Sequence, residues 1–298
     1  MERLSTREGE IQKEDKVRAI SELRRDFPLP GLLKLAGLPR SSYYHILNRL
    51  NKPERYADVR AEIHKICQEN QGRYGYRRVT AELHKRGFRT NHKLVMKIMK
   101  QERLTCRVRM KKYRSYKGEI GKIAPNLINR DFHADHPNQK WTTDITEFSL
   151  FGQKLYLSPI LDMFNGEIIS YTIYDNPVLK QVTDMLELAF AKIPEKSDLI
   201  FHSDQGWQYQ HRTIQKMLGD RGIRQSMSRK GNCLDNSVME NFFGLLKSEL
   251  LYLQDFESIE DFKKKLIDYI YYYNNQRIKC KLKGMSPVEY RTHSQVAA

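Results

Sequence analysis

Three acidic residues in the second half of the chain stand where their side chains can reach one cleft. Asp144 lies in residues 141–146, whose alternating threonine, isoleucine and aromatic residues predict a strand. Asp204 follows the apolar run 199–201, which suits a buried strand, so it lies at or just past a strand end. Glu240 lies on a predicted helix. Three converging carboxylates repel one another unless cations join them, and hard oxygen ligands favour Mg²⁺ or Mn²⁺.

The helix that carries Glu240 is predicted to follow a turn at Gly231 and Asn232. Asp235 is a candidate N-cap for it. Its apolar face is expected from Val238, Phe242, Leu245, Leu246 and Leu250. A second stripe at helical spacing contains Asn236, Glu240, Phe243 and Lys247. Lys247 lies two turns, roughly 10 Å, beyond Glu240, and its ammonium can only donate to a phosphate or a base. A solvated lysine is the alternative.

Two divalent ions about 4 Å apart can activate an attacking oxygen and stabilise a leaving oxygen at a phosphodiester. A single aspartate at a strand end is more often a cap or a surface group, so the metal assignment depends on all three carboxylates together. Two nearby acidic residues fit other roles, Asp162 on the second predicted strand and Asp235 as a cap. The residues expected to line the cleft and contact the substrate strand or metal-bound water are His202, Gln205, Gln208 and Asn236.

The order and spacing of the three carboxylates resemble the Asp-Asp-Glu pattern of retroviral integrases and of the insertion-sequence-three family of bacterial transposases. Thirty-five residues separate Asp204 from Glu240, and Lys247 follows seven residues after Glu240. The sequence motifs around the carboxylates resemble those of the bacterial family: Trp-Thr-Thr-Asp-Ile-Thr, His-Ser-Asp-Gln-Gly and Asn-Cys-Leu-Asp-Asn-Ser-Val-Met-Glu-Asn-Phe-Phe. The resemblance covers about residues 74–291. It implies that Asp144, Asp204 and Glu240 hold Mg²⁺ or Mn²⁺, with two ions per active site.

The same resemblance implies a DNA transposase, a polynucleotidyl transferase that cleaves DNA at the ends of an insertion sequence and joins them by strand transfer. The implied partners are double-stranded DNA, as terminal inverted repeats and as target, and further copies of the chain in an oligomer on DNA. The helix-turn-helix product of the upstream reading frame is another, fused by frameshifting or bound. A stand-alone nuclease of the same fold and a non-catalytic DNA-binding regulator are the alternatives.

The net positive charge of the chain comes entirely from residues 1–136. Residues 1–136 contain 32 lysines and arginines against 16 acidic residues, whereas residues 137–298 contain 20 of each. The whole net charge of +16 therefore lies in residues 1–136. Such an excess suits the phosphate backbone of DNA and supplies affinity that does not depend on base sequence. A merely solvated basic surface is the alternative.

Cysteine usage and hydropathy indicate the compartment. The four cysteines are far apart and form no Cys-x-x-Cys pair, so neither a disulfide framework nor a zinc site is expected. His133 and His136 lack the cysteine pair that completes the zinc module of retroviral integrases, and the sequence departs from those proteins there. No apolar run approaches the roughly 20 residues of a membrane span, and no signal peptide is visible. We expect a protein of the bacterial cytoplasm, associated with the nucleoid when bound to DNA, with no membrane partner.

The pattern of residues 53–105 predicts a helix-turn-helix. Helices are expected at 56–69, at 79–85 and, after an Asn91 cap, up to about residue 102. On the third helix Leu94, Val95, Ile98 and Met99 are expected to face inward. The opposite stripe is the layout of a recognition helix entering a major groove, and it contains Lys93, Lys97 and Lys100. Arg77 and Arg78, before the second helix, are further candidates for DNA contact. A solvated lysine face is the alternative.

A helical segment precedes this region and a basic segment follows it. Residues 31–47 predict a helix, a tight turn at 37–39 and a second helix, which is either another helix-turn-helix or two amphipathic helices packing on each other. Residues 16–27 suit a short helix, ended by Pro28 and Pro30. A basic linker lying along the DNA backbone is expected after residue 105, with a hinge as the alternative. Its candidate DNA contacts are Arg107, Arg109, Lys111, Lys112 and Arg114.

The second half predicts a mixed sheet followed by helices. Strands are expected at 140–150, 154–163, 167–174, 199–202 and 223–228, and helices at 178–192 and 210–219, followed by the helix that carries Glu240 and by helices at 259–273 and 288–291. Together with the carboxylates, this order indicates an α/β fold, a ribonuclease-H-like integrase core with a mixed five-stranded sheet, preceded by an all-α helix-turn-helix region. The predicted division is a helical region 1–52, a DNA-binding domain 53–105, a basic linker 106–136, a catalytic core 137–252 and a helical extension 253–298.

Overall fold

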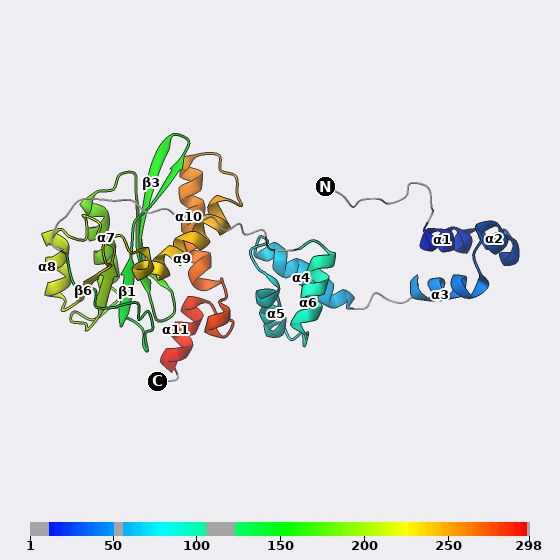
Figure 1. The fold of residues 1–298 in the computed structure, drawn as a ribbon, viewed down its shortest axis with the longest axis horizontal. Coiled ribbons are helices and arrows are strands. Elements are labelled where there is room, and N and C mark those ends of the chain that lie inside the picture. Colours follow the sequence, from blue (N-terminus) through cyan, green and yellow to red (C-terminus); the bar gives the residue numbers. More distant parts are fainter. Residues whose placement is uncertain (1–11, 51–55, 105, 107–122, 297–298) are drawn as a thin grey trace. The chain divides into compact units, whose positions relative to one another are not determined.

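The computed structural model describes residues 12–50, 56–104, 106 and 123–296 of the chain (Figure 1). It contains two compact units, residues 12–62 and residues 63–296, and the division falls within helix α4. Within these described ranges no helix is long and apolar enough to cross a membrane.

The first unit is a small helical bundle of α1 (Lys13–Leu23), α2 (Leu29–Ala36) and α3 (Arg40–Leu50), followed by the start of α4. The predicted helix, tight turn and helix are confirmed, because Gly37 takes a left-handed backbone (φ 64°) between α2 and α3. Pro28 and Pro30 lie at the start of the next helix. Pro28 occupies the N-cap position of α2, and Pro30 lies in its first turn, where the fixed φ of proline suits a helix start. The buried core consists of Val17, Ile20, Leu33, Leu38, Tyr43 and Ile46.

The predicted three-helix pattern before the core is present as α4 (Ala57–Glu69), α5 (Tyr76–Lys85) and α6 (His92–Gln101). Helix α5 begins at Tyr76, three residues before the predicted start. Asn91 caps α6 as expected, since its side chain accepts a hydrogen bond from the Lys93 amide. On α6 the residues Val95, Ile98 and Met99 are buried, so the predicted inward face is confirmed for these three.

The predicted catalytic core, residues 137–252, contains a six-stranded sheet where five strands were expected. Its strands are β1 (Lys140–Thr143), β2 (Thr146–Leu150), β3 (Gln153–Asp162), β4 (Ile168–Tyr174), β5 (Ile200–Ser203) and β6 (Arg224–Met227). The extra strand arises because the first predicted strand, 140–150, is divided between β1 and β2. Both halves pair antiparallel with β3, which also pairs with β4, whereas β5 pairs parallel with β1 and β6 parallel with β5.

The division of the first strand has a local cause in β3. Thr143 pairs with Ile160 and Thr146 with Leu157, so the register is unbroken and Asp144 stands opposite Pro159. Proline has no N–H to donate to the ladder, so regular pairing stops there. Asp144 therefore lies in a short interruption between β1 and β2, which leaves its side chain at an irregular point of the sheet.

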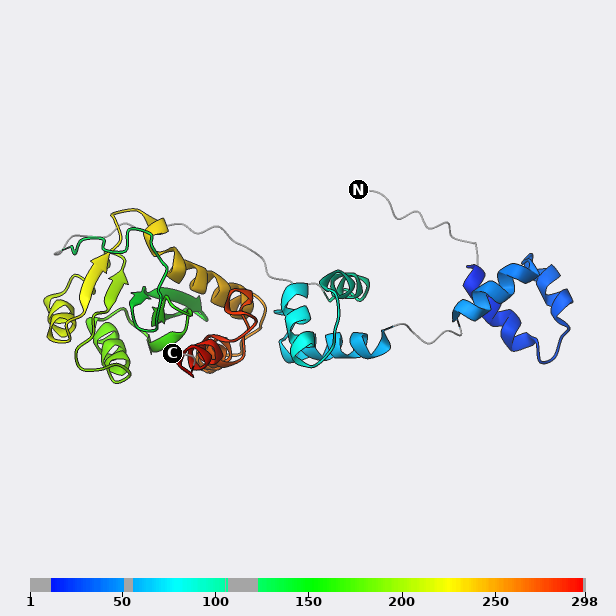
Figure 2. The same cartoon turned by 90° about the horizontal axis from the view of Figure 1, so that it is seen from below.

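Helices cover both faces of the sheet (Figures 1 and 2). The helices α7 (Leu179–Phe190) and α8 (Arg212–Asp220) pack on one face, over a core that includes Trp141, Phe201 and Met227. The other face carries α9 (Ser237–Leu246), preceded by a 3₁₀ turn, Cys233–Asn236. Strand order and helix placement are those of a ribonuclease-H-like core, so the predicted fold class is confirmed.

The chain after α9 is helical, as predicted, with one feature that the sequence pattern did not indicate. Helix α9 continues directly into a π-helical turn at Lys247–Leu251. Then follow α10 (Ile259–Asn275), a 3₁₀ turn at Cys280–Leu282 and α11 (Pro287–Val296), which is longer than the predicted 288–291. Ser286 and Glu289 exchange backbone and side-chain hydrogen bonds in a capping box, and the helix begins at Pro287, one residue before the predicted 288.

Candidate active site

Strand alternation places the two aspartates on the face of the sheet that α9 covers. Successive side chains of a strand point to opposite faces. In β1 the Thr143 hydroxyl contacts Met185 on α7, whereas the Thr142 hydroxyl donates to Asn236 beside α9. Asp144 follows Thr142 on the α9 side.

The same argument applies to β5, the neighbouring parallel strand. Phe201 belongs to the core beneath α7, whereas the His202 ring bonds the carbonyl of Asp235 just before α9. Asp204 continues the His202 side, at the carboxyl end of the strand. Glu240 lies in the first turn of α9. The predicted convergence of three carboxylates from β1, β5 and α9 thus has a structural basis.

Each aspartate is held through one oxygen by a backbone amide. The Ile145 amide donates to Oδ1 of Asp144 at 2.7 Å, and the Gly206 amide donates to Oδ1 of Asp204 at 2.9 Å. Gly206 is needed for this approach, because a Cβ at that position would lie 2.9 Å from Oδ1 of Asp204. The second oxygen of each carboxylate has no hydrogen-bond partner within the described part of the chain.

The electrostatics of the three carboxylates show an excess of negative charge. Burial and the charges of Asp204 and Glu240 raise the pKa of Asp144 well above its usual value. Burial also raises the pKa of Asp204 and that of Glu240. None of the three forms an ion pair with another described residue. All three remain partly open to solvent, so a cation or a substrate can reach them.

Lys247 is the one described cation whose charge acts on Asp144 to lower its pKa. It is half-buried at the start of the π turn, and burial lowers its own pKa although Asp144 and Glu147 oppose this. Its ammonium lies over the Phe148 ring, 5.7 Å from the centroid. The predicted position on the carboxylate side is confirmed, and its contact with DNA remains a prediction. A π turn inside a helix is often found at functional sites.

The donor set suits a divalent metal ion. The oxygens are hard ligands, their mutual repulsion is uncompensated by the chain, and the site is open. In the part of the chain that the structure describes, however, no three His, Cys, Asp or Glu side chains are gathered closely enough to hold a metal ion by themselves. A Mg²⁺ ion usually takes one or two carboxylates and completes its coordination with water and substrate phosphate.

Three of the four residues expected to line the cleft are instead buried. His202 is fully buried, its Nδ1 within 2.9 Å of the Ser226 hydroxyl, and burial lowers its pKa to about 4. Asn236 donates from Nδ2 to the Thr143 carbonyl and thereby ties α9 to β1. These two residues hold the scaffold and do not face the cleft. Gln208 is buried as well. Gln205 is partly exposed and donates to the Ser228 carbonyl, and its contact with substrate remains a prediction.

The two acidic residues set aside from the metal site have structural roles. Asp162 is buried and pairs with Arg291, which confirms that it lies outside the carboxylate site. The predicted N-cap role of Asp235 is wrong, because α9 begins after Asn236 and has no side-chain cap. Asp235 is fully buried and instead bonds two arginines, Arg130 and Arg229.

The predicted DNA contacts outside the core fall into three groups. Lys93, Lys97 and Lys100 are exposed on α6, and Arg77 is exposed at the start of α5, so all four are accessible to a ligand. Arg78 is different: it stacks on Tyr74 and lies 3.7 Å from the buried Glu249, so its guanidinium is engaged within the protein. The linker candidates lie outside the described residues: Arg107, Arg109, Lys111, Lys112 and Arg114.

Sequence reasoning missed a tyrosine beneath the carboxylates. Tyr209 is buried, with its hydroxyl 3.2 Å from that of Thr143. Burial and the charges of Asp144 and Asp204 raise the pKa of Tyr209 well above its usual value. The only sequence signal was its place five residues after Asp204. Arg130 and Arg229 were missed as well, since nothing in the sequence joins either of them to Asp235.

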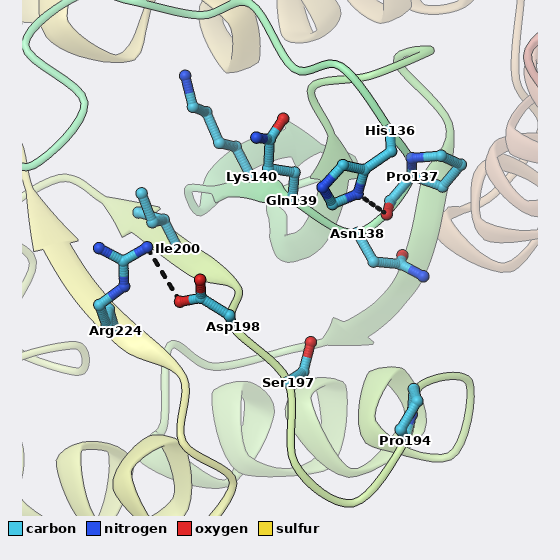
Figure 3. A pocket seen from close by; sticks show the side chains of 10 residues that line it. All are labelled: His136, Pro137, Asn138, Gln139, Lys140, Pro194, Ser197, Asp198, Ile200 and Arg224. Carbon is cyan, nitrogen blue, oxygen red and sulfur yellow. Dashed lines mark hydrogen bonds and ion pairs between the residues drawn. The ribbon is translucent and has the colours of Figure 1, made fainter.

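The described part of the chain also contains a pocket of about 350 Å³ at the opposite edge of the sheet (Figure 3). It is lined by residues at the amino ends of β1, β5 and β6, among them Lys140, Ile200 and Arg224, and Arg224 pairs there with Asp198. None of the candidate catalytic residues lines it. The carboxylates follow the carboxyl ends of β1 and β5, so this pocket is separate from the candidate site.

Known families match the chain along most of its length. The integrase core domain family matches residues 134–233 and, in a second part, residues 240–294, and an HTH-like domain family matches residues 54–112. The putative transposase InsK of insertion sequence element IS150 from Escherichia coli K12 is 51% identical over 93% of this chain and 98% of its own length. The chain belongs to the IS3 family of insertion-sequence transposases.

Two further similarities accompany this one. An uncharacterized transposase-like protein of Haemophilus influenzae is 55% identical over 68% of this transposase and 94% of its own length. The HTLV-2 integrase catalytic core domain, solved in complex with magnesium, matches 53% of the transposase and 98% of its own chain, with 18% identity and a TM-score of 0.44. The matched integrase core segments of the transposase include Asp144 and Asp204 in the first and Glu240 in the second.

Proposed function

We propose that this transposase cleaves and joins DNA at the ends of its insertion sequence with a divalent-metal site made by Asp144, Asp204 and Glu240. The observation that carries the proposal is the convergence of three carboxylates on one face of the sheet with no arginine or lysine paired to them. Two Mg²⁺ or Mn²⁺ ions per site are proposed, and when bound they would activate the attacking oxygen and stabilise the leaving oxygen.

The residues of the chain prepare this site before any ligand arrives. The amides of Ile145 and Gly206 orient the aspartates and leave one oxygen of each for the cleft. Asn236 fixes the start of α9 against β1, which sets the position of Glu240. Such preorganisation lowers the cost of assembling the reacting groups. Lys247 is proposed to donate to a phosphate of the terminal DNA strand.

Two transfers at phosphorus follow from this arrangement. In the first, a water oxygen bonds to phosphorus at the element end, and the 3′ oxygen leaves and takes a proton. In the second, that 3′-hydroxyl gives up its proton and its oxygen bonds to the phosphorus of another DNA phosphate. The bond from that phosphorus to the 3′ oxygen of the attacked strand breaks, and this leaving oxygen takes a proton. We propose that the first joining links one element end to the other on the same strand. No covalent bond between protein and DNA is required.

The remaining parts of the chain are proposed to hold the DNA. The lysines of α6 fit a major groove, and the basic residues at 107–114 fit a phosphate backbone. We retain the division into 1–52, 53–105, 106–136, 137–252 and 253–298 as a proposal, together with an oligomer on DNA and a partner from the upstream reading frame. Acting on chromosomal DNA would place the protein at the nucleoid.

A cleavage assay on labelled element ends tests the proposal against its two alternatives. With Mg²⁺ the transposase should release a 3′-hydroxyl at the element end and join it, and neither step should occur in chelator. Equal cutting of unrelated DNA would instead indicate a stand-alone nuclease. Tight binding without cutting under all metal conditions would indicate a non-catalytic regulator.

A further inference from the structure

Asp235 is a buried carboxylate that gathers an unusual number of donors. The amide, Nε and Nη2 of Arg229 all donate to it, at 2.9–3.0 Å. Nε of Arg130 donates at 3.0 Å and Nδ2 of Asn126 at 3.1 Å. Two carboxylate oxygens accept about four hydrogen bonds in all, so this group is saturated. The hydrogen bonds of Arg229 are the main cause that lowers the pKa of Asp235, so it stays ionised.

The two arginines that Asp235 holds are only half-buried. The side chain of Arg130 is 46% exposed and that of Arg229 is 53% exposed, while Asp235 itself has no exposed surface. Within the described residues, neither terminal nitrogen of Arg130 has a hydrogen-bond partner, and Nη1 of Arg229 has none. Two guanidinium groups on one carboxylate leave a net positive charge, fixed in place and open to solvent. Guanidinium is suited to bidentate binding of phosphate.

Arg229 and its partner Asp235 lie at the same edge of the sheet as the candidate catalytic aspartates. Asp144 follows β1, Asp204 follows β5, and Arg229 comes two residues after β6, and these strands are parallel neighbours. The Ser228 amide donates to the Ser203 carbonyl, so the segments leading to Asp204 and Arg229 are bonded together. Strand spacing of about 4.8 Å puts Arg229 roughly 10 Å from Asp144, or a few nucleotides along a DNA strand.

The backbone that presents Arg130 is held in a rarely used conformation. Asn129 and Arg130 both have positive φ, 45° and 66°, and neither is glycine. The Asn126 side chain accepts from the Asn129 amide, which fixes this turn while its Nδ2 bonds Asp235. Consecutive left-handed residues cost free energy and persist where the surroundings impose them, often at functional sites.

We propose that Arg130 and Arg229, held by Asp235, form a phosphate clamp that grips the substrate DNA strand a few nucleotides from the reacting bond. This inference rests on the proposed function and adds a binding site to it. Arg130 and Arg229 are the binding residues, and Asp235 is a positioning residue.

Salt dependence of DNA binding by the full chain is the first test. The variants Arg130→Gln and Arg229→Gln should each reduce the slope of log affinity against log salt by about one and weaken binding on the order of tenfold. Arg224→Gln is the matched control, since Arg224 is also 53% exposed and paired with an aspartate, but at the opposite end of β6. It should leave slope and affinity unchanged.

Phosphate-ethylation interference then locates the contact. It is performed on element-end DNA in the Asp204→Asn background, so that the footprint does not depend on cleavage. Interference at one or two phosphates beside the reacting bond should be lost with Arg130→Gln and Arg229→Gln, retained with Arg224→Gln and partly restored with Arg229→Lys. In the same background, Asp235→Asn should lose the same phosphates together, because both arginines lose the carboxylate that positions them.

An unchanged footprint and an unchanged salt slope in the double Arg130→Gln, Arg229→Gln variant would overturn the clamp. So would equal losses in the Arg224→Gln control. If the wild-type chain cleaves no DNA, the proposed function fails on its own, while the footprint still decides whether the clamp exists.

Discussion

Two carboxylates on one continuous helical segment of this transposase have opposite surroundings. Glu240, in α9, is one of the three candidate metal ligands, and Glu249 lies nine residues later in the π turn. Glu249 is almost fully buried, yet Arg277 donates to both of its oxygens at 2.6 and 2.8 Å and Tyr269 donates at 3.0 Å. Burial alone would raise the pKa of Glu249, but the bonds and charge of Arg277 outweigh it and lower that pKa.

The contrast shows where the chain supplies its own cations and where it does not. An isolated buried charge is costly unless it is paired, and Glu249, Asp162 and Asp235 all have arginines. Asp144 and Asp204 have no arginine. Burial raises their pKa values, but it also raises that of Asp162 although Arg291 lies beside it, so the missing arginine and not the raised pKa separates the two groups. Carboxylates without a paired cation can take one from solution.

The Glu249 cluster also joins the helix-turn-helix to the catalytic segment. Nε of Arg73 donates to the Glu249 carbonyl, and Tyr74 bonds the backbone of Gln276 and Ile278. These contacts connect the start of α5 to the π turn and to the end of α10. The paired carboxylate of Glu249 therefore lies where these segments are joined.

Asp204→Asn gives the largest expected effect on activity. It removes one negative charge with little change in shape, so strand transfer should fall by several orders of magnitude while DNA binding is retained. The control is Asp220→Asn, an exposed residue at the end of α8, which should join DNA at the parental rate. Joining at the parental rate by Asp204→Asn in Mg²⁺ would contradict the assignment of the three carboxylates as metal ligands.

Arg277→Met gives the largest expected effect on stability. It leaves Glu249 buried without a cation, which should cost about 3–5 kcal/mol of unfolding free energy in chemical denaturation. The double variant Glu249→Gln, Arg277→Met should recover much of this loss, because no unpaired charge remains. A loss of less than about 1 kcal/mol in the single variant would show that Arg277 does not offset the buried charge of Glu249.

His202 is a buried group that stays uncharged, and it should make the free energy of unfolding depend on pH. The pKa of His202 is lowered to about 4 from an ordinary 6.5, so the unfolded chain binds its proton first as pH falls. The contribution of neutral His202 to the free energy of unfolding is fully present above pH 6.5. It is lost as pH falls to about 4, by about 3 kcal/mol in total. Denaturation of His202→Gln should show a correspondingly shallower fall between these values. Equal slopes in parent and variant would mean that His202 titrates normally.

Lys247→Ala should give a smaller effect. Its half-buried side chain contacts Phe148, so the loss of stability should stay within about 1 kcal/mol. End joining should fall on the order of tenfold through loss of one charged hydrogen bond to phosphate. Lys247→Arg should retain part of the rate, since charge survives while donor geometry changes. Parental joining by Lys247→Ala, with no crosslink from position 247 to element-end DNA, would reduce Lys247 to a solvated lysine.

Much of the fold and the core of the site could be predicted because their signals are local. Strand periodicity and the Asn91 cap were each visible in a few neighbouring residues. The split of the first strand was predictable in principle, since Pro159 lies in its partner strand, but only once the register was known. The burial of His202 and the clamp on Asp235 depend on contacts between distant segments, which no local pattern contains.

The most direct test of the central claim is the thermal unfolding of the parent and of Asp204→Asn with and without Mg²⁺ or Mn²⁺, at several pH values and without DNA. Carboxyl groups with raised pKa stabilise the metal-free fold at low pH and lose that contribution as pH rises through the raised value. The ions should therefore raise the parental Tm by several degrees, and the rise should grow as pH increases through the raised pKa values, because the ions replace protons on these groups. Asp204→Asn should show little or no shift, and Asp220→Asn the parental one. Equal shifts in parent and Asp204→Asn, or a shift that does not grow with pH, would contradict the claim that these carboxylates are kept unpaired for a metal.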